Sequence, residues 1–231
     1  TSQTPKPLLP VAGVPAIQRI LNQLIKLKGR EIVVVTGYRN EEISLFLQNE
    51  FGNEIKLVYN ERFEDDTNIL SVDLGVDALS KPDLGYTIIE TDIILETKGW
   101  EHFLSFRGDS FSAWATVGCY SEKLTGAAVK VSNAGSVTKI VYAPEYDRDF
   151  EGWLKMLGIL KVGFKEVEYD RELRKKAINN GIDQYYLNPW LENLDHLPCR
   201  TIDLSDYFGG AFNDLVSYKQ INQGYEKLLI K

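Results

Sequence analysis

Short apolar runs alternate with segments of helical periodicity between residues 14 and 89. The run 32–35 is continuously β-branched and ends in Thr36-Gly37-Tyr38, a character typical of strands buried on both faces of a parallel sheet. The alternation predicts an α/β fold with a doubly wound, mostly parallel, Rossmann-like sheet. The expected helices cover 14–27, 41–51 and 67–80, the last with Thr67 as its N-cap, and the expected strands cover 32–35, 56–59 and 86–89.

The second half of the chain has a different pattern. Its apolar runs lie closer together, and Asn133-Ala134-Gly135 supplies a turn between two of them, which predicts an inserted β-hairpin region. No repeat or linker interrupts the chain, so we expect a single domain over residues 1–231. The expected strands cover 113–120, 127–131, 137–142 and 157–162, and the expected helices cover 171–180 and 215–229.

The composition excludes some classes of partner. The 231 residues carry a net charge of −7, whereas a broad nucleic-acid surface needs a basic face. The two cysteines, Cys119 and Cys199, form no CxxC, which favours reduced thiols in a cytoplasmic protein. No apolar run approaches the roughly 20 residues of a membrane span. We therefore expect a cytoplasmic protein with neither a nucleic-acid nor a membrane partner.

The segment TPKPLLPVAGVP at residues 4–15 is the strongest functional signal. Prolines on both sides of Lys6 stiffen the backbone, so an ammonium can be held where phosphoryl charge develops. The bland alternative is a proline-rich loop with a solvated lysine. The segment strongly resembles the PKPLLPV-x-G-x-P signature of the nucleotidyltransferase family, which makes nucleotide sugars and CDP-alcohols. In that family the lysine contacts the triphosphate, so the resemblance implies a catalytic role for Lys6.

Glu90-Thr91-Asp92 follows the expected strand at 86–89. Ligands of open α/β sheets bind at the carboxyl ends of strands, and a carboxylate there can hold Mg²⁺. In isolation an E-x-D is more often a solvated loop. The family carries a metal-binding aspartate at this place, so the resemblance implies that Asp92 binds Mg²⁺. Glu90 would then contact the nucleotide ribose, or the metal through water.

Asn213 and Asp214 precede the expected terminal helix. Their segment resembles a late stretch of the family whose aspartate completes the metal site, which implies Mg²⁺ binding by Asn213 or Asp214. The alternative is that one of these residues is the helix N-cap. Both roles can hold at once.

Two further segments resemble the choline-phosphate cytidylyltransferase branch of the family. The first, residues 59–71, places Asn68 and Ser71 at a helix start that faces a nucleotide. Gly37 and Tyr38, at the end of an earlier strand, are further expected nucleotide contacts. The second segment is YYLNPWLENLD at 185–195.

A quaternary ammonium is recognised by aromatic faces and a carboxylate. Trp114, Trp190 and Glu192 are therefore expected substrate contacts, although most aromatic residues of any chain belong to its core.

The resemblance implies a Mg²⁺-dependent nucleotidyltransferase that joins a nucleoside triphosphate, preferably CTP, to a small phosphomonoester such as phosphocholine. The family's first strand and glycine-rich loop stand before the PKP segment, so we expect them upstream of Thr1. Two rivals remain open, a sugar-1-phosphate nucleotidyltransferase and an inactive, nucleotide-binding regulatory homologue. The protein is also a possible homo-oligomer.

Overall fold

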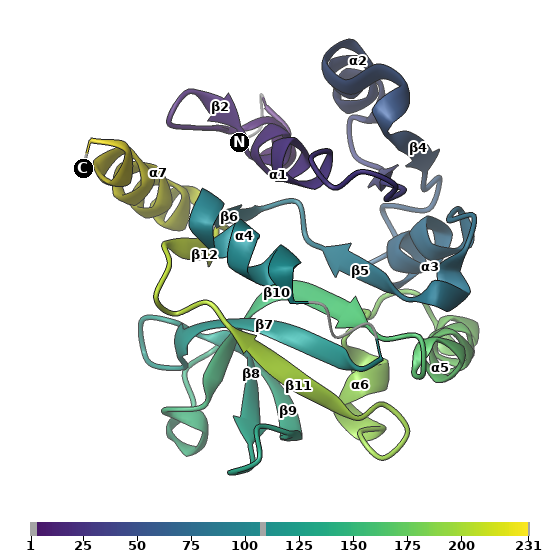
Figure 1. The fold of residues 1–231 in the computed structure, drawn as a ribbon, viewed down its shortest axis with the longest axis vertical. Coiled ribbons are helices and arrows are strands. Elements are labelled where there is room, and N and C mark those ends of the chain that lie inside the picture. The colour runs from purple at the N-terminus through teal and green to yellow at the C-terminus, as the bar shows by residue number, and fades with distance from the viewer. Residues whose placement is uncertain (1–3, 107–109, 231) are drawn as a thin grey trace.

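Helices and strands alternate in the first part of the chain in the predicted order (Figure 1). The computed structural model describes residues 4–106 and 110–230. A short hairpin of β1 (Pro10–Val11) and β2 (Val14–Pro15) comes first. The elements that follow are α1 (Ala16–Leu24), β3 (Val33–Thr36), α2 (Asn40–Phe51), β4 (Lys56–Tyr59), α3 (Ile69–Asp77) and β5 (Tyr86–Ile89).

The predicted N-cap of α3 is wrong. Asp66, and not Thr67, accepts hydrogen bonds from the first amides of this helix, Leu70 N at 3.0 Å and Ser71 N at 2.8 Å. A carboxylate is a strong acceptor for the unpaired N–H groups at a helix start. The helix begins at Ile69, and its N-cap residue is Asn68, whose side chain makes no capping bond.

β3 and β4 form a parallel pair, in register from Val33 opposite Lys56 to Thr36 opposite Tyr59. Helices α1 and α2 cover it with buried apolar side chains that include Leu21 and Leu47. Burial of side chains of this size contributes about 1.5–3 kcal/mol each, before the loss of conformational entropy is counted.

The second half of the chain builds a six-stranded sheet in the order β11-β7-β10-β8-β9, with β5 also paired to β10. The pair β11–β7 is parallel, and β10 is antiparallel to β5, β7 and β8. A bridge between Ser136 and Arg200 joins the β9 end of the sheet to β11, so the sheet curls on itself (Figure 1). The strands are β7 (Ser112–Cys119), β8 (Gly126–Val131), β9 (Val137–Ala143), β10 (Leu154–Val162) and β11 (Cys199–Asp203).

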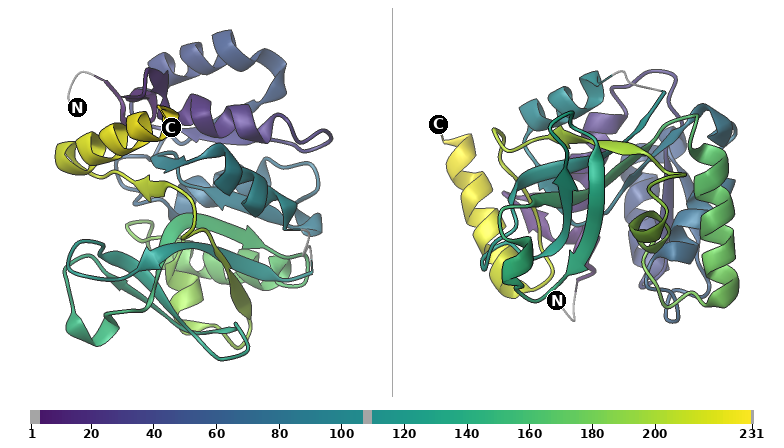
Figure 2. Two further views of the ribbon diagram at one scale, coloured as in Figure 1. Left: turned by 60° about the vertical axis from the view of Figure 1, so that its left-hand side comes forward. Right: turned by 90° about the horizontal axis from the view of Figure 1, so that it is seen from below.

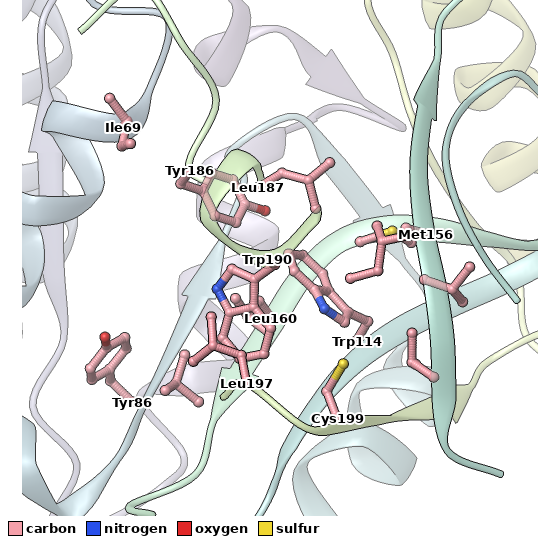
Figure 3. Close-up of a cluster of buried hydrophobic side chains, with 14 of the residues drawn as sticks. Ile69, Tyr86, Trp114, Met156, Leu160, Tyr186, Leu187, Trp190, Leu197 and Cys199 are labelled. Carbon is pink, nitrogen blue, oxygen red and sulfur yellow. The ribbon is translucent and has the colours of Figure 1, made fainter. Parts of the chain in front are cut away.

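The buried cluster around Trp114, Tyr186 and Trp190, here called the aromatic core, packs between the curled sheet and the helices α5 (Val167–Asn180) and α6 (Asn188–Glu192). Figure 3 shows these three side chains. Trp114 and Trp190 meet edge to face, with ring centroids 5.8 Å apart. The indole of Trp190 donates to Asp170 at 2.8 Å, and Asp170 also pairs with the buried Arg174. Buried charges require such pairing, because an isolated one would be strongly destabilising.

A second short sheet connects the end of β5 with the end of the chain. β6 (Ile93–Leu95) pairs antiparallel with β12 (Gly209–Ala211), placing Ala211 opposite Ile93. Helix α4 (Thr97–Ser105) follows β6, and α7 (Leu215–Leu229) follows β12. Figure 2 shows α7 and α5 on opposite sides of the curled sheet. Within the described residues, no helix combines the length and the apolar character needed to cross a bilayer.

A large cavity lies between β3 and β5. Among residues 4–106 and 110–230, neither the β3 edge opposite β4 nor the β5 edge opposite β10 pairs with another strand. The cavity has a volume of about 1800 Å³ and is lined by Val33–Val35, Tyr86–Ile89 and apolar side chains of α1 and α3. It extends to the carboxyl end of β5, where Glu90 and Asp92 line it.

Candidate active site

Three side chains from distant parts of the chain meet at the carboxyl end of β5. The Lys6 ammonium donates to Asp92 Oδ2 at 2.7 Å and to Asn213 Oδ1 at 2.9 Å. These contacts join residues that lie 86 and 207 positions apart in the sequence. The structure therefore brings together the predicted catalytic lysine and two of the predicted metal ligands.

Local sequence explains how Lys6 is held. Pro5 and Pro7 flank it, and Lys6–Leu8 forms a single 3-10 turn, in which Leu8 N donates to Pro5 O at 2.9 Å. The hairpin that follows turns at Ala12 and Gly13, both with positive φ, a conformation that favours glycine. Proline-restricted torsions and a tight turn leave the lysine backbone few alternatives.

The β6–β12 pair explains the position of Asn213. Because Ile93 directly follows Asp92 and lies opposite Ala211, the residue two positions after Ala211 is brought back to Asp92. Neither of these three-residue strands is long enough to show a periodicity in the sequence.

Asp92 has the features of a metal ligand. Its Oδ1 is buried without a hydrogen-bond partner, while Oδ2 faces Lys6. Mg²⁺ is usually held by one or two protein oxygens, with waters and substrate phosphates completing its shell. Asp92 Oδ1 and Asn213 Oδ1 fit that pattern. Among the described residues no group of three or more His, Cys, Asp or Glu could hold a metal, so further ligands would come from substrate and water.

Asp214 has the other of its two predicted roles. Its carboxylate accepts from Ser217 N at 2.7 Å, in a capping box that starts α7. The hydrogen bond from this backbone amide, aided by the Ser217 hydroxyl, lowers the pKa of Asp214. Of the two adjacent residues, Asn213 faces Lys6 and Asp214 caps the helix.

Glu90 lies deeper in the same cavity. Its Oε1 accepts from the Tyr186 hydroxyl at 3.2 Å, and a Cβ on Gly158 would come within 2.5 Å of its Oε2. Burial, and next the charge of Asp92, raise the pKa of Glu90. The carboxylate is thus held by packing on β10 and by one phenol.

Lys155 is a cavity residue that the sequence reasoning missed. It lines the cavity beside Gly126, and its Nζ donates to the Met156 carbonyl at 2.7 Å. Burial lowers the pKa of Lys155 to about 8, although the nearby Glu90 charge opposes this shift. The available signal was weak, because the β10 segment LKMLGILKV carries two lysines, Lys155 and Lys161, in a largely apolar run.

The predicted nucleotide contacts line two neighbouring cavities. Asn68 and Ser71 line the large cavity, where Asn68 Oδ1 accepts from Tyr186 N at 2.8 Å. The Ser71 hydroxyl donates to Asp66 at 2.7 Å. Gly37 and Tyr38 line a smaller cavity of about 260 Å³, to which Lys6 also contributes.

The predicted substrate contacts are only partly near the cavity. Trp114 lines it but is 1% exposed and stacks on Tyr186 with ring centroids 6.0 Å apart. Trp190 is fully buried in the aromatic core, and Glu192 is exposed at the end of α6; neither lines either cavity. The structure therefore brings neither of these two residues to the Lys6 site.

Two further aromatic residues, both tyrosines, line the cavity. Tyr142 and Tyr185 both line it, and their hydroxyls are 3.1 Å apart with ring centroids at 4.8 Å. Both side chains are partly exposed to solvent.

Known proteins resemble this chain in sequence and in fold. A family model described as "Domain of unknown function (DUF6564)" matches residues 15–123. The 2-aminoethylphosphonate cytidylyltransferase of Lancefieldella rimae is 26% identical over 196 residues, which are 81% of this chain and 76% of that protein. The choline-phosphate cytidylyltransferase of Haemophilus influenzae is 30% identical over 95 residues, 41% of this chain and 38% of that protein.

The solved structure of the CTP:phosphocholine cytidylyltransferase from Streptococcus pneumoniae superposes with a TM-score of 0.79 and 20% identity, covering 96% of this chain and 90% of that one. These comparisons point to the nucleotidyltransferase family. The α/β class and the nucleotide-diphospho-sugar transferase type of fold are confirmed. In this chain, Lys6, Asp92 and Asn213 meet at the carboxyl end of β5 of that fold.

Proposed function

We propose that this protein is a Mg²⁺-dependent cytidylyltransferase that joins CTP to a small phosphate monoester or phosphonate and releases pyrophosphate. Phosphocholine and 2-aminoethylphosphonate are the first acceptors to test, since relatives bear these names. The observation that carries the proposal is the Lys6 ammonium, held 2.7 Å from Asp92 and 2.9 Å from Asn213. One cation and two oxygen ligands in one place suit a triphosphate and its metal.

The proposed reaction is an in-line displacement. An oxygen of the acceptor phosphate or phosphonate attacks the α-phosphorus of CTP, and the bond from that phosphorus to the bridging oxygen breaks as pyrophosphate leaves. The nucleophile is already an anion, so the protein needs to supply positioning and charge stabilisation more than proton transfer.

Each of the three residues has a role in this scheme. Asp92 and Asn213 would hold Mg²⁺, which when bound neutralises charge on the phosphate oxygens. Lys6 stabilises negative charge on the transferring phosphoryl group. In the structure its ammonium bonds to Asp92 and Asn213. On binding of a triphosphate it would donate to phosphate oxygens instead, and Asp92 and Asn213 would be available to hold Mg²⁺.

The test is pyrophosphate release by the full-length protein with Mg²⁺. CTP, UTP, GTP and dTTP are each paired with phosphocholine, 2-aminoethylphosphonate, glucose-1-phosphate and mannose-1-phosphate. We expect turnover with CTP and one of the first two acceptors. Turnover only with a sugar-1-phosphate would favour the sugar branch. Nucleotide binding without any turnover, unaltered by Lys6→Ala, would favour a regulatory homologue.

A further inference from the structure

Besides Lys6, the cation of Lys155 lines the cavity toward the carboxyl end of β5. Lys6 is engaged by Asp92 and Asn213, as described above. Lys155 comes from β10 in the other half of the molecule. A reaction between two phosphorylated substrates brings two anionic groups together, so one cation for each would reduce their repulsion.

The strand register places Lys155 near the reacting end of the sheet. β10 runs antiparallel to β5, with Ile159 opposite Ile89. Moving from Ile159 back to Lys155 therefore follows the direction from Ile89 toward Asp92. Glu90 lines the same cavity as Lys6 and Lys155, and the charges of both lysines oppose the rise in the pKa of Glu90.

The Lys155 ammonium has donors to spare. Among the described residues its hydrogen-bond partner is the Met156 carbonyl, whereas an ammonium carries three N–H donors. Gly126 lies beside it, and a Cβ there would be only 3.4 Å from Nζ. The absence of a side chain at Gly126 leaves this space open to the cavity, which both residues line.

We propose that Lys155 binds the phosphate or phosphonate group of the acceptor, while Lys6 serves the nucleotide. This inference rests on the proposed function, since it assigns the second substrate of the same reaction. The ammonium donates two N–H bonds to oxygens of the acceptor dianion and orients its third oxygen toward the α-phosphorus. A partly buried ammonium gains more from such a charge-assisted bond than one in water does.

A purely structural role for Lys155 makes a different prediction. If the ammonium serves only to neutralise Glu90, its removal would affect all ligands alike. If the ammonium binds the acceptor, its removal would lower the affinity for dianions more than the affinity for monoanions. The pair 2-aminoethylphosphonate and 2-aminoethylsulfonate has this difference in charge and nearly the same shape.

The experiment is calorimetric titration of the full-length protein with each of these two compounds, and separately with CTP and Mg²⁺. We expect Lys155→Met to raise the Kd of 2-aminoethylphosphonate at least tenfold and to reduce the preference for the phosphonate over the sulfonate at least fivefold. The Kd of CTP should stay within twofold of the wild-type value. Lys155→Arg, which retains a cation, should keep most of the preference. Lys130 is an exposed residue of β8, and Lys130→Met is the matched control. This variant should keep the wild-type affinity for both the phosphonate and the sulfonate.

Three results would overturn the proposal. The wild type could fail to bind the phosphonate, Lys155→Met could lose the same affinity for the phosphonate and the sulfonate, or Lys155→Met could lose affinity for CTP alone. Lys155→Gln repeats the measurement with a polar side chain if the methionine variant does not fold. The titration is independent of turnover. If the protein is an active transferase and its acceptor affinity does not change in the Lys155 variants, only this inference is refuted. If phosphonate binding depends on Lys155 but no turnover occurs, only the proposed function is refuted.

Discussion

At the Lys6 end of the cavity, three polar side chains from distant segments hydrogen-bond to one another. At the Glu90 end, a carboxyl group packs on the β-sheet. The Lys6 side chain is 37% exposed, and its partners lie on loops after β5 and β12. Glu90 instead rests on Gly158 of β10 and on Tyr186, which stacks on the buried Trp114.

The difference indicates two ways of preparing a site. Loop residues that pair with each other can exchange partners when a charged ligand arrives. Side chains held by core packing keep their positions with or without a ligand, because protein interiors are close-packed. We therefore expect changes at the Lys6 end to affect rate with little effect on stability, and changes at the Glu90 end to affect both.

The largest effect is expected from Lys6→Met. Loss of a preorganised charge aimed at a transition state lowers kcat by about 10²–10³-fold. The free energy of unfolding should change little, because the Lys6 side chain is 37% exposed and ion pairs of such residues contribute about 0–1 kcal/mol. Steady-state pyrophosphate release and urea unfolding measure the two quantities. Lys219→Ala, on the exposed face of α7, is the control; a large stability loss in Lys6→Met alone would break the comparison.

Gly158→Ala tests the Glu90 end. Gly158 has a φ of +69°, and the new Cβ would come within 2.5 Å of Glu90 Oε2. Left-handed strain costs about 1–2 kcal/mol, and overpacking adds about 1–3 kcal/mol. We expect a lower free energy of unfolding together with a raised acceptor KM.

Gly152→Ala separates these two contributions. Gly152 has a similar φ of +81°, but a Cβ added there would meet nothing within 4 Å, so this variant carries the strain alone. Equal stability loss and equal acceptor KM in the two variants would show that the contact with Glu90 has no consequence.

The acceptor KM should also depend on pH. Burial lowers the pKa of Lys155 to about 8, so its ammonium is present below that pH and is lost as the pH rises through it. If the ammonium binds the acceptor, KM rises above pH 8 by up to about tenfold per pH unit. In Lys155→Arg the guanidinium stays charged and the rise should disappear. A wild-type KM that is flat from pH 7 to 10 would contradict this expectation.

The smallest effect is expected from Asp214→Ala. Loss of a helix N-cap lowers the melting temperature by about 2–4 °C in a protein of this size. The Mg²⁺ concentration for half-maximal activity should stay unchanged, since the Asp214 carboxylate bonds to Ser217. The same titration with Asn213→Ala should show a higher requirement for Mg²⁺. A shifted requirement in Asp214→Ala would instead restore its predicted role as a metal ligand.

Long periodic elements could be predicted from the sequence, and short ones could not. The run 32–35 and the pattern around Leu47 are strong enough to identify β3 and α2. β6 and β12 are only three residues each, and two residues of β12 are glycine. These strands form because Ile94 packs against Phe212 and the neighbouring core, a contact that no local pattern contains.

The candidate site was predictable where one side chain suffices. Lys6 and Asp92 were predicted from the resemblance of their segments to the nucleotidyltransferase family, and proline context and the end of a strand gave a physical reason for each. The choice between Asn213 and Asp214 depended on which side chain points toward Lys6. Trp190 has the aromatic ring expected of a substrate contact, but it is fully buried in the core, where its indole donates to Asp170.

The sequence by itself determined the α/β class, the order of the main elements and the identity of the lysine at the front of the chain, because periodicity and proline stiffness act over a few residues. The tertiary structure decided which oxygens surround that lysine and that Lys155 lines the same cavity. Such contacts join residues up to 207 positions apart. They depend on strand pairing and packing, which local sequence does not encode.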